Sequence, residues 1–203
     1  MALGDPVLLR KKRGVKTDKP RLIDFGGAII PPLGGATQTI HRLGTRHAID
    51  ITIPLMRTEP DGRQWAADLS LAKLYGAIVH LRQDGFKIGL PGNPEVDGGG
   101  QLGSLLELRD FVPHYAMRYG QWLSLQVGGI WYAYRAAATT IADSEGKMTL
   151  PIFPMIRRSP ADGDTAAVAD PKLQGSLSGN EVSWTRLTSP YCDFGTISIS
   201  EDC

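Results

Sequence analysis

The feature that most constrains the fold is a pair of short apolar runs joined by two glycines. Residues 122–127, WLSLQV, alternate apolar and polar side chains from Leu123 onward, and Gly128-Gly129 then lead into IWYAYR at 130–135. A period of two is typical of a β-strand, and a Gly-Gly pair between two such runs predicts a two-residue hairpin. The pair therefore favours an antiparallel barrel or sandwich over a βαβ fold.

Other segments extend this β pattern. The chain has 24 glycines and 14 prolines among 203 residues, as expected for many short strands joined by tight turns. The run AIDITIPL, residues 48–55, predicts a strand with one apolar face made of Ile49, Ile51, Ile53 and Leu55. We expect about ten strands in all.

One helix is predicted, over about residues 61–75. Asp61 is a suitable N-cap, and Gln64 three positions later completes a capping-box pattern. Trp65, Leu69 and Ala72 follow at helical spacing, and Gly76 supplies a left-handed stop. The single apolar stripe predicts a helix that packs on a sheet.

Composition narrows the class of protein. With 42% hydrophobic and 21% charged residues the chain can bury a core, and no window approaches the roughly 18 apolar residues of a membrane helix. The N-terminus does not read as a secretory signal, and Cys192 and Cys203 are too few for a disulfide framework or a zinc site. We expect synthesis in the cytoplasm.

The net charge of +1 is unevenly placed. Residues 1–21 hold seven basic and two acidic side chains, a net charge of +5, and the remaining residues carry 15 basic and 19 acidic side chains, a net charge of −4. The basic segment, residues 10–21, could contact nucleic acid or an acidic partner. A solvated segment is the plainer interpretation.

No catalytic or metal-binding pattern is recognisable, so we expect a protein that is not an enzyme and uses no cofactor or metal. Gly98 to Gly103, GGGQLG, fits the dinucleotide fingerprint but lacks the strand before it, and the residues after it are ambiguous, which favours a flexible β-loop. The four histidines have no acidic or cysteine neighbours at metal-ligand spacing. They are His41, His47, His80 and His114.

Aromatic and basic residues gather in the second half of the chain. A small barrel with such a face can stack bases or sugars, but alternate aromatic residues can equally fill a core or a subunit contact. The candidate ligand or subunit contacts are Tyr119, Trp131, Tyr134, Arg135, Arg157 and Arg158.

The stretch GKMTLPIFPMIRRSP, residues 146–160, is an apolar run interrupted by Pro151 and Pro154. Proline cannot donate a ladder hydrogen bond, so it belongs at strand edges and bulges. We expect a strand near the rim of a barrel, with Met148, Leu150 and Ile152 turned inward. Arg157 and Arg158 would stay solvated or meet acids on a neighbouring subunit.

The order of these elements resembles the distal tail protein of long-tailed, non-contractile bacteriophages. The matching parts are the strand AIDITIPL, the helix segment GRQWAADLSLAKLYG, a long all-β excursion and two closing strands. The resemblance implies a β-sandwich or barrel hub domain, residues 1–82 plus 171–203, that carries an inserted barrel, residues 83–170, of the oligosaccharide/oligonucleotide-binding (OB) type. The strand and helix patterns themselves predict a fold that is mainly β with one long helix.

The resemblance also implies a function. Six copies would form a ring at the distal end of the tail, joining the tail tube protein to the baseplate hub or tail-tip protein and its fibres. DNA would pass through the lumen without specific binding, and the barrel could meet a host-surface saccharide. Two alternatives stay open: another tail or head–tail joining protein, such as a tube, terminator or adaptor subunit, and a carbohydrate- or nucleic-acid-binding barrel module.

Overall fold

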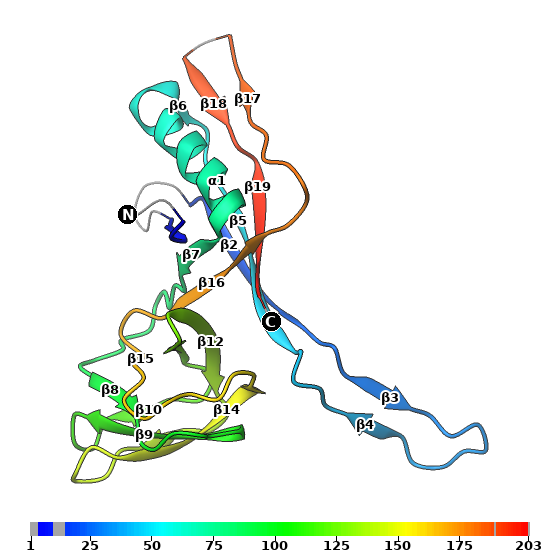
Figure 1. Ribbon diagram of the computed structural model, residues 1–203, viewed down its shortest axis with the longest axis vertical. Helices are drawn as coiled ribbons and strands as arrows, with labels where there is room; N and C mark the ends of the chain where they lie inside the picture. Colours follow the sequence, from blue (N-terminus) through cyan, green and yellow to red (C-terminus); the bar gives the residue numbers. More distant parts are fainter. Residues whose placement is uncertain (1–3, 10–14, 189, 203) are drawn as a thin grey trace. The chain divides into compact units, whose positions relative to one another are not determined.

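The computed structural model describes residues 4–9, 15–188 and 190–202, and it is mainly β with one long helix, as predicted (Figure 1). Its contacts divide the chain into two compact units. The hub unit takes in the described residues of 1–21, 47–82 and 172–202, and the barrel unit those of 22–46 and 83–171. The expected division differs at residues 22–46, which we had assigned to the hub. These residues form a hairpin of their own, between the strands β3 (Gly27–Ile29) and β4 (Gln38–Ile40).

The hub unit is built on a six-stranded sheet with the order β1-β7-β16-β19-β5-β2. The two strands from the end of the chain, β16 and β19, lie side by side in its middle, between the early strands β1 and β7 on one side and β5 and β2 on the other. Among the pairings described, β1 with β7 is parallel and the others are antiparallel. Its strands are β1 (Val7–Leu8), β2 (Thr17–Ile23), β5 (Arg46–Thr52), β7 (Ala77–His80), β16 (Lys172–Leu177) and β19 (Thr196–Glu201). A smaller sheet in the same unit has the order β17-β18-β6, made of Thr185–Arg186, Tyr191–Asp193 and Met56–Arg57.

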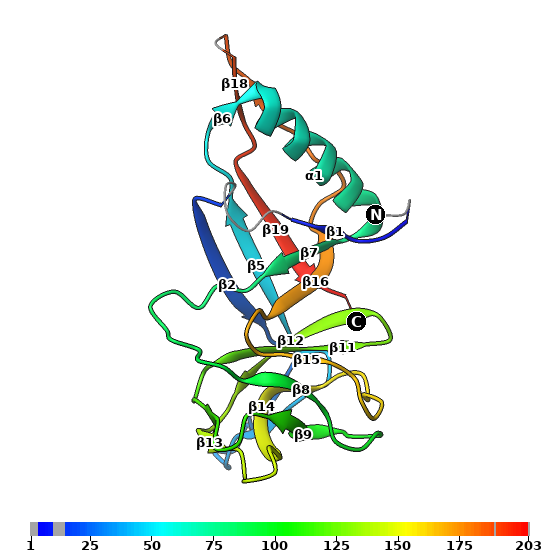
Figure 2. The ribbon, with the colours of Figure 1, turned by 90° about the vertical axis from the view of Figure 1, so that its left-hand side faces the viewer.

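The helix α1 (Arg63–Tyr75) contacts β16 and β1 and runs beside the hub sheet (Figure 2). Its apolar stripe is buried at Trp65, Leu69 and Ala72, as the spacing predicted. The same-face prediction holds for Ile49 and Ile51 of β5 and for Ile53 directly after it, which are all buried. Leu55, the fourth residue of that prediction, lies outside the strand and is exposed.

The helix begins differently from the prediction. Asp61 lies in a π-helical turn, η1 (Thr58–Gly62), and no side chain caps the helix. Gly62 precedes the first residue of α1, and a Cβ there would lie 2.3 Å from the sulfur of Cys192. The close approach of Cys192 thus leaves room only for glycine at this turn. The N-cap position falls on Gly62, one residue later than the predicted cap at Asp61.

The helix ends where the sequence predicted. Gly76 has φ +90°, and its N–H donates to the carbonyl of Ala72. Across the parts of the chain that the structure describes, no helical segment is long and apolar enough to cross a membrane.

The barrel unit contains a nearly closed sheet of six antiparallel strands, in the order β15-β11-β12-β14-β9-β8. A bridge between Glu95 and Thr165 joins the two ends of this order. The structure is OB-like in being a small, nearly closed antiparallel barrel, although it uses six strands where an OB fold uses five. The strands are β8 (Gly92–Val96), β9 (Gly103–Phe111), β11 (Trp122–Val127), β12 (Ile130–Ala136), β14 (Met148–Ile156) and β15 (Ala166–Ala167). A separate short pair is β10 (Ala116–Met117) with β13 (Thr140–Ile141).

The predicted hairpin of residues 122–135 is present. β11 and β12 pair from Trp122–Arg135 to Val127–Ile130, and Gly128 and Gly129 form the turn with positive φ. Leu123 and Leu125 enter the barrel core together with Tyr132 and Tyr134. The opposite face is also buried at Ser124 and Ala133, which are register partners.

The strand that we expected near the rim of the barrel is β14, and it lies inside the sheet rather than at its edge. β14 is paired on both sides, with β12 and with β9. Met148, Leu150 and Ile152 point into the core as predicted. The pairing with β9 is regular up to Pro151 and shifts before Ile156, so the prolines coincide with a ladder irregularity rather than a free edge.

Candidate interaction surfaces

The predicted contact residues on β12 point to opposite faces of the strand. Trp131 and Arg135 share the outer face, whereas Tyr134 lies in the barrel core and is fully buried. Trp131 is also buried, although it points away from the core. Because adjacent side chains of a strand alternate between faces, these three residues cannot form one stacking platform.

Arg135 serves as a packing element of the barrel. Its guanidinium carbon lies 3.9 Å from the ring centroid of Trp122, its register partner on β11. Burial lowers the pKa of Arg135 because a charged group loses hydration there. The stack on an indole face offsets part of that loss.

Of the three remaining candidates, Arg157 and Arg158 are neighbours in the chain, whereas Tyr119 precedes β11. Tyr119 is highly exposed in the turn before β11, and its backbone N–H donates to the Thr139 hydroxyl at 3.1 Å. Arg157 does not stay solvated as expected, because its guanidinium nitrogens are buried and the group lies 5.1 Å from the ring centroid of Tyr132. Arg158 is exposed, and a Cβ at Gly128 would lie 3.2 Å from its guanidinium. The six residues therefore do not make up a single site.

The GGGQLG loop is held by hydrogen bonds of its own. The Gln101 amide donates to the carbonyls of Asp97, Gly98 and Glu107, and its oxygen accepts the Glu107 N–H. The expectation that no strand precedes the glycines is wrong, because β8 ends at Val96. Strand β9 starts at Gly103, so no helix follows the glycines as a dinucleotide site requires. The loop is a structural element of the barrel.

One arginine organises the acidic residues beside this loop. Arg109 lies 2.5 Å from Asp162, 3.4 Å from Asp97 and 3.7 Å from Glu95. The Gly98 N–H, followed by Arg109, lowers the pKa of Asp162. Within the described ranges, no three histidine, cysteine or acidic side chains are grouped so as to hold a metal ion. These carboxylates instead tie the loop to the barrel wall.

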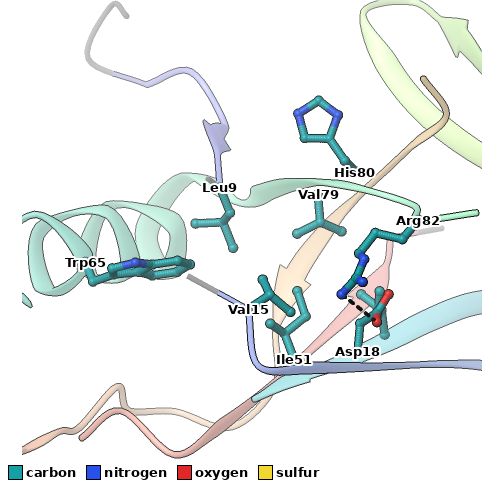
Figure 3. A pocket seen from close by; sticks show the side chains of 9 residues that line it. Leu9, Val15, Asp18, Ile51, Trp65, Val79, His80 and Arg82 are labelled. Carbon is teal, nitrogen blue, oxygen red and sulfur yellow. Dashed lines mark ion pairs between the residues drawn. The ribbon is translucent and has the colours of Figure 1, made fainter. Parts of the chain in front are cut away.

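A small cavity lies in the hub unit between α1 and the sheet (Figure 3). Trp65, Leu9 and Val79 line it, and an Arg82–Asp18 ion pair of 3.5 Å stands at one side. Its volume is about 20 Å³, room for a water molecule and for nothing larger. It is a gap in the core rather than a ligand site.

The hub sheet carries a neutralised polar network across β2, β5 and β19. Arg21 donates to the Asp50 carboxylate at 3.2 Å and to the Ser198 hydroxyl at 2.6 Å. A hydrogen bond from Ser198, and then the charge of Arg21, lower the pKa of Asp50. Of the basic segment, Arg10, Lys11, Lys12 and Arg13 lie outside the described residues. Lys16 and Lys19 are exposed.

The clearest unpartnered feature is the arm, residues 22–46. It is a two-stranded ribbon, β3 and β4, to which no third strand of the described residues is hydrogen-bonded (Figure 1). Phe25 to Ile40 contain no charged residue, and this run is the sequence signal of the arm. Ile30 is 74% exposed and Leu33 is 98% exposed. An isolated ribbon is marginally stable in water, and exposed apolar clusters mark contact sites.

The base of the arm is held firmly. Asp24 accepts hydrogen bonds from the Gly26 N–H and the Thr45 hydroxyl, both at 2.8 Å. The Arg46 guanidinium lies 4.8 Å from the ring centroid of Phe25. The Gly26 N–H, and then Thr45, lower the pKa of Asp24. These contacts join the two ends of the arm and so present its apolar tip in a defined way.

The hub unit has an open hollow beside β16 and β19, which we call the hub hollow. Its apolar lining comes from Leu177, Val182, Phe194 and Ile197, and its volume is about 340 Å³. Trp184 packs near Phe194 with ring centroids 6.0 Å apart and remains 38% exposed. Serine and threonine hydroxyls complete the lining, with Glu181 as its one charged residue.

No protein-family model matches the chain, and no curated protein matches it either.

Proposed function

We propose that this chain is a structural protein of a bacteriophage virion, a distal tail protein that forms a six-membered ring between the tail tube and the tail tip. One observation carries the proposal. The hub sheet takes β1, β2, β5 and β7 from before residues 83–171 and takes β16 and β19 from after them. A hub closed by the two ends of the chain, around an inserted barrel, is the organisation that the resemblance implies.

The two edge strands of the hub sheet are compatible with assembly into a ring. β1 and β2 are its outermost strands, and β2 carries Pro20 between Lys19 and Arg21. Proline and charges on an edge strand prevent indiscriminate pairing while leaving a specific contact possible. A ring needs one surface of each copy to meet a different surface of the next, with a rotation that closes.

The proposal includes partners and a location. The ring would contact the tail tube protein on one side and the baseplate hub or tail-tip protein on the other. DNA would pass through the lumen without specific binding. The protein would be made in the host cytoplasm and function at the distal end of the tail.

A carbohydrate- or nucleic-acid-binding module is a weaker candidate. Trp131 and Tyr134, the aromatic residues that it would use, are buried and lie on opposite faces of β12. Substituting them would disturb packing before it disturbed a ligand. A host-surface saccharide would have to use other side chains, such as the exposed Tyr119.

Labelling of intact particles tests the proposal against the other tail proteins. Gold-labelled antibody against this chain should mark one position, the end of the tail farthest from the head. Label along the whole tube would assign the chain to the tube, and label at the head–tail joint would assign it to a terminator or adaptor. Either result would overturn the proposal.

A further inference from the structure

We propose that the tip of the arm of one copy docks in the hub hollow of a second copy. The inference rests on the proposed function only in requiring that the protein assembles with itself. The occupant is Ile30–Leu33, and the acceptor is the lining formed by Leu177, Val182, Phe194 and Ile197.

The tip has the properties of an inserted anchor. Gly34 N–H donates to the Pro31 carbonyl at 3.3 Å, so the chain turns there with Leu33 beside the turn glycine, whose φ is +82°. Two prolines restrict the backbone of this turn before it binds, which reduces the entropy lost on docking. Leu33 is 98% exposed at the end of the ribbon, so burying its side chain against a partner would remove a large apolar surface from water.

The hub hollow offers four apolar side chains within a largely polar lining, and its size suits this anchor. Its volume of about 340 Å³ is at the lower end of the range of ligand pockets, so it admits a few side chains rather than a domain. The tip carries no charge, and the hollow has only Glu181, so docking would leave almost no charge to be desolvated. The hollow also offers the exposed face of Trp184 close by, and tryptophan is enriched among residues that dominate interfaces.

A second copy is the occupant that this arrangement selects. The tip and the hollow belong to different units, so each copy carries one protruding and one receiving surface. Two different surfaces that meet between identical copies make a head-to-tail contact, the type that closes rings. A partner of another kind would leave the tip or the hollow of every copy uncovered.

Paired cysteine variants test the contact directly. Two proteins are made, one with Leu33→Cys and the other with Val182→Cys, and each also carries Cys203→Ser. After mixing under mild oxidation, we expect a disulfide-linked dimer that contains one chain of each kind. Ser144→Cys, at an exposed barrel turn, replaces Val182→Cys in the control and should give none above background.

The outcomes separate this inference from the proposed function. Leu33→Asp should weaken self-association on the order of thirtyfold, the effect of losing a dominant anchor, while Leu90→Asp, at another exposed leucine, should not. If wild-type rings form and Leu33→Asp forms them equally well, the docking is wrong and the ring proposal stands. A third protein carries both Leu33→Cys and Val182→Cys in one chain. A disulfide that forms within this chain, with no mixed dimer from the two single variants, would also overturn the docking. If the wild type never assembles, both proposals fail.

Discussion

Two adjacent leucines on β9 offer a matched test of the barrel. Leu106 is completely buried and pairs with the equally buried Leu150 of β14, whereas Leu105 is 57% exposed. Burying a leucine side chain contributes about 1.5–3 kcal/mol, and the cavity left by truncation adds to the loss. Leu106→Ala should therefore cost about 3–4 kcal/mol, and Leu105→Ala about 1 kcal/mol or less.

The measurement must separate the barrel from the hub, because two units need not unfold in one transition. Hydrogen exchange of peptides spanning β9 and the β11–β12 hairpin, followed in urea, reports the opening of the barrel alone. With a urea slope of about 2 kcal/mol per molar, Leu106→Ala should lower the midpoint by about 1.5–2 M. Equal losses for the two variants would refute the inside-outside assignment of β9.

The remaining predictions concern the barrel loops. Asp162→Asn should speed hydrogen exchange in residues 97–103 at neutral pH, because the carboxylate accepts the Gly98 N–H and pairs with Arg109. The pKa of Asp162 is lowered in the folded state, so its contribution is present above its ordinary pKa of about 3.8 and is lost as pH falls through the folded value. The difference between the two proteins should thus shrink on acidification, and a difference that grows would contradict the assignment. Gly146→Ala should cost more than about 2 kcal/mol in urea unfolding, because φ is +79° and the Cβ would lie 2.3 Å from the Phe111 carbonyl oxygen. Gly98→Ala, with a similar φ and an open surrounding, should show only the backbone strain of about 1–2 kcal/mol, and equal costs would argue against the close contact.

Local patterns in the sequence predicted local structure well. The two-residue turn at Gly128-Gly129, the stop of the helix at Gly76, and the inward side chains of β14 all depend on periodicity or on backbone freedom at one position. Such features are decided by a few neighbouring residues. They can therefore be predicted without knowledge of the tertiary contacts.

The errors arose where a distant segment decides the outcome. The turn before α1 packs Gly62 against Cys192, 130 positions away in the chain. Alternation along β11 distinguishes two faces but does not reveal what covers each one, so the burial of Ser124 on the non-core face could not be predicted. The capping pattern at Asp61 gave no hint of this contact.

The candidate contact residues also depend on tertiary structure that neighbouring residues do not reveal. Tyr134 and Arg135 are neighbours in the sequence but point to opposite faces of β12, so a local abundance of aromatic and basic residues did not make a site. The arm was missed because its exposure depends on the absence of a third strand beside β3 and β4, which no residue in the arm specifies. Its uncharged run from Phe25 to Ile40 was the available signal.

The central claim, a ring-forming tail protein, is tested most directly by the native mass and negative-stain images of the purified chain, alone and with its tube partner. The account predicts closed rings with sixfold symmetry and a mass of about 132 kDa, six copies of the 22.0 kDa chain. A protein that stays monomeric at high concentration, even with the tube partner present, would contradict it.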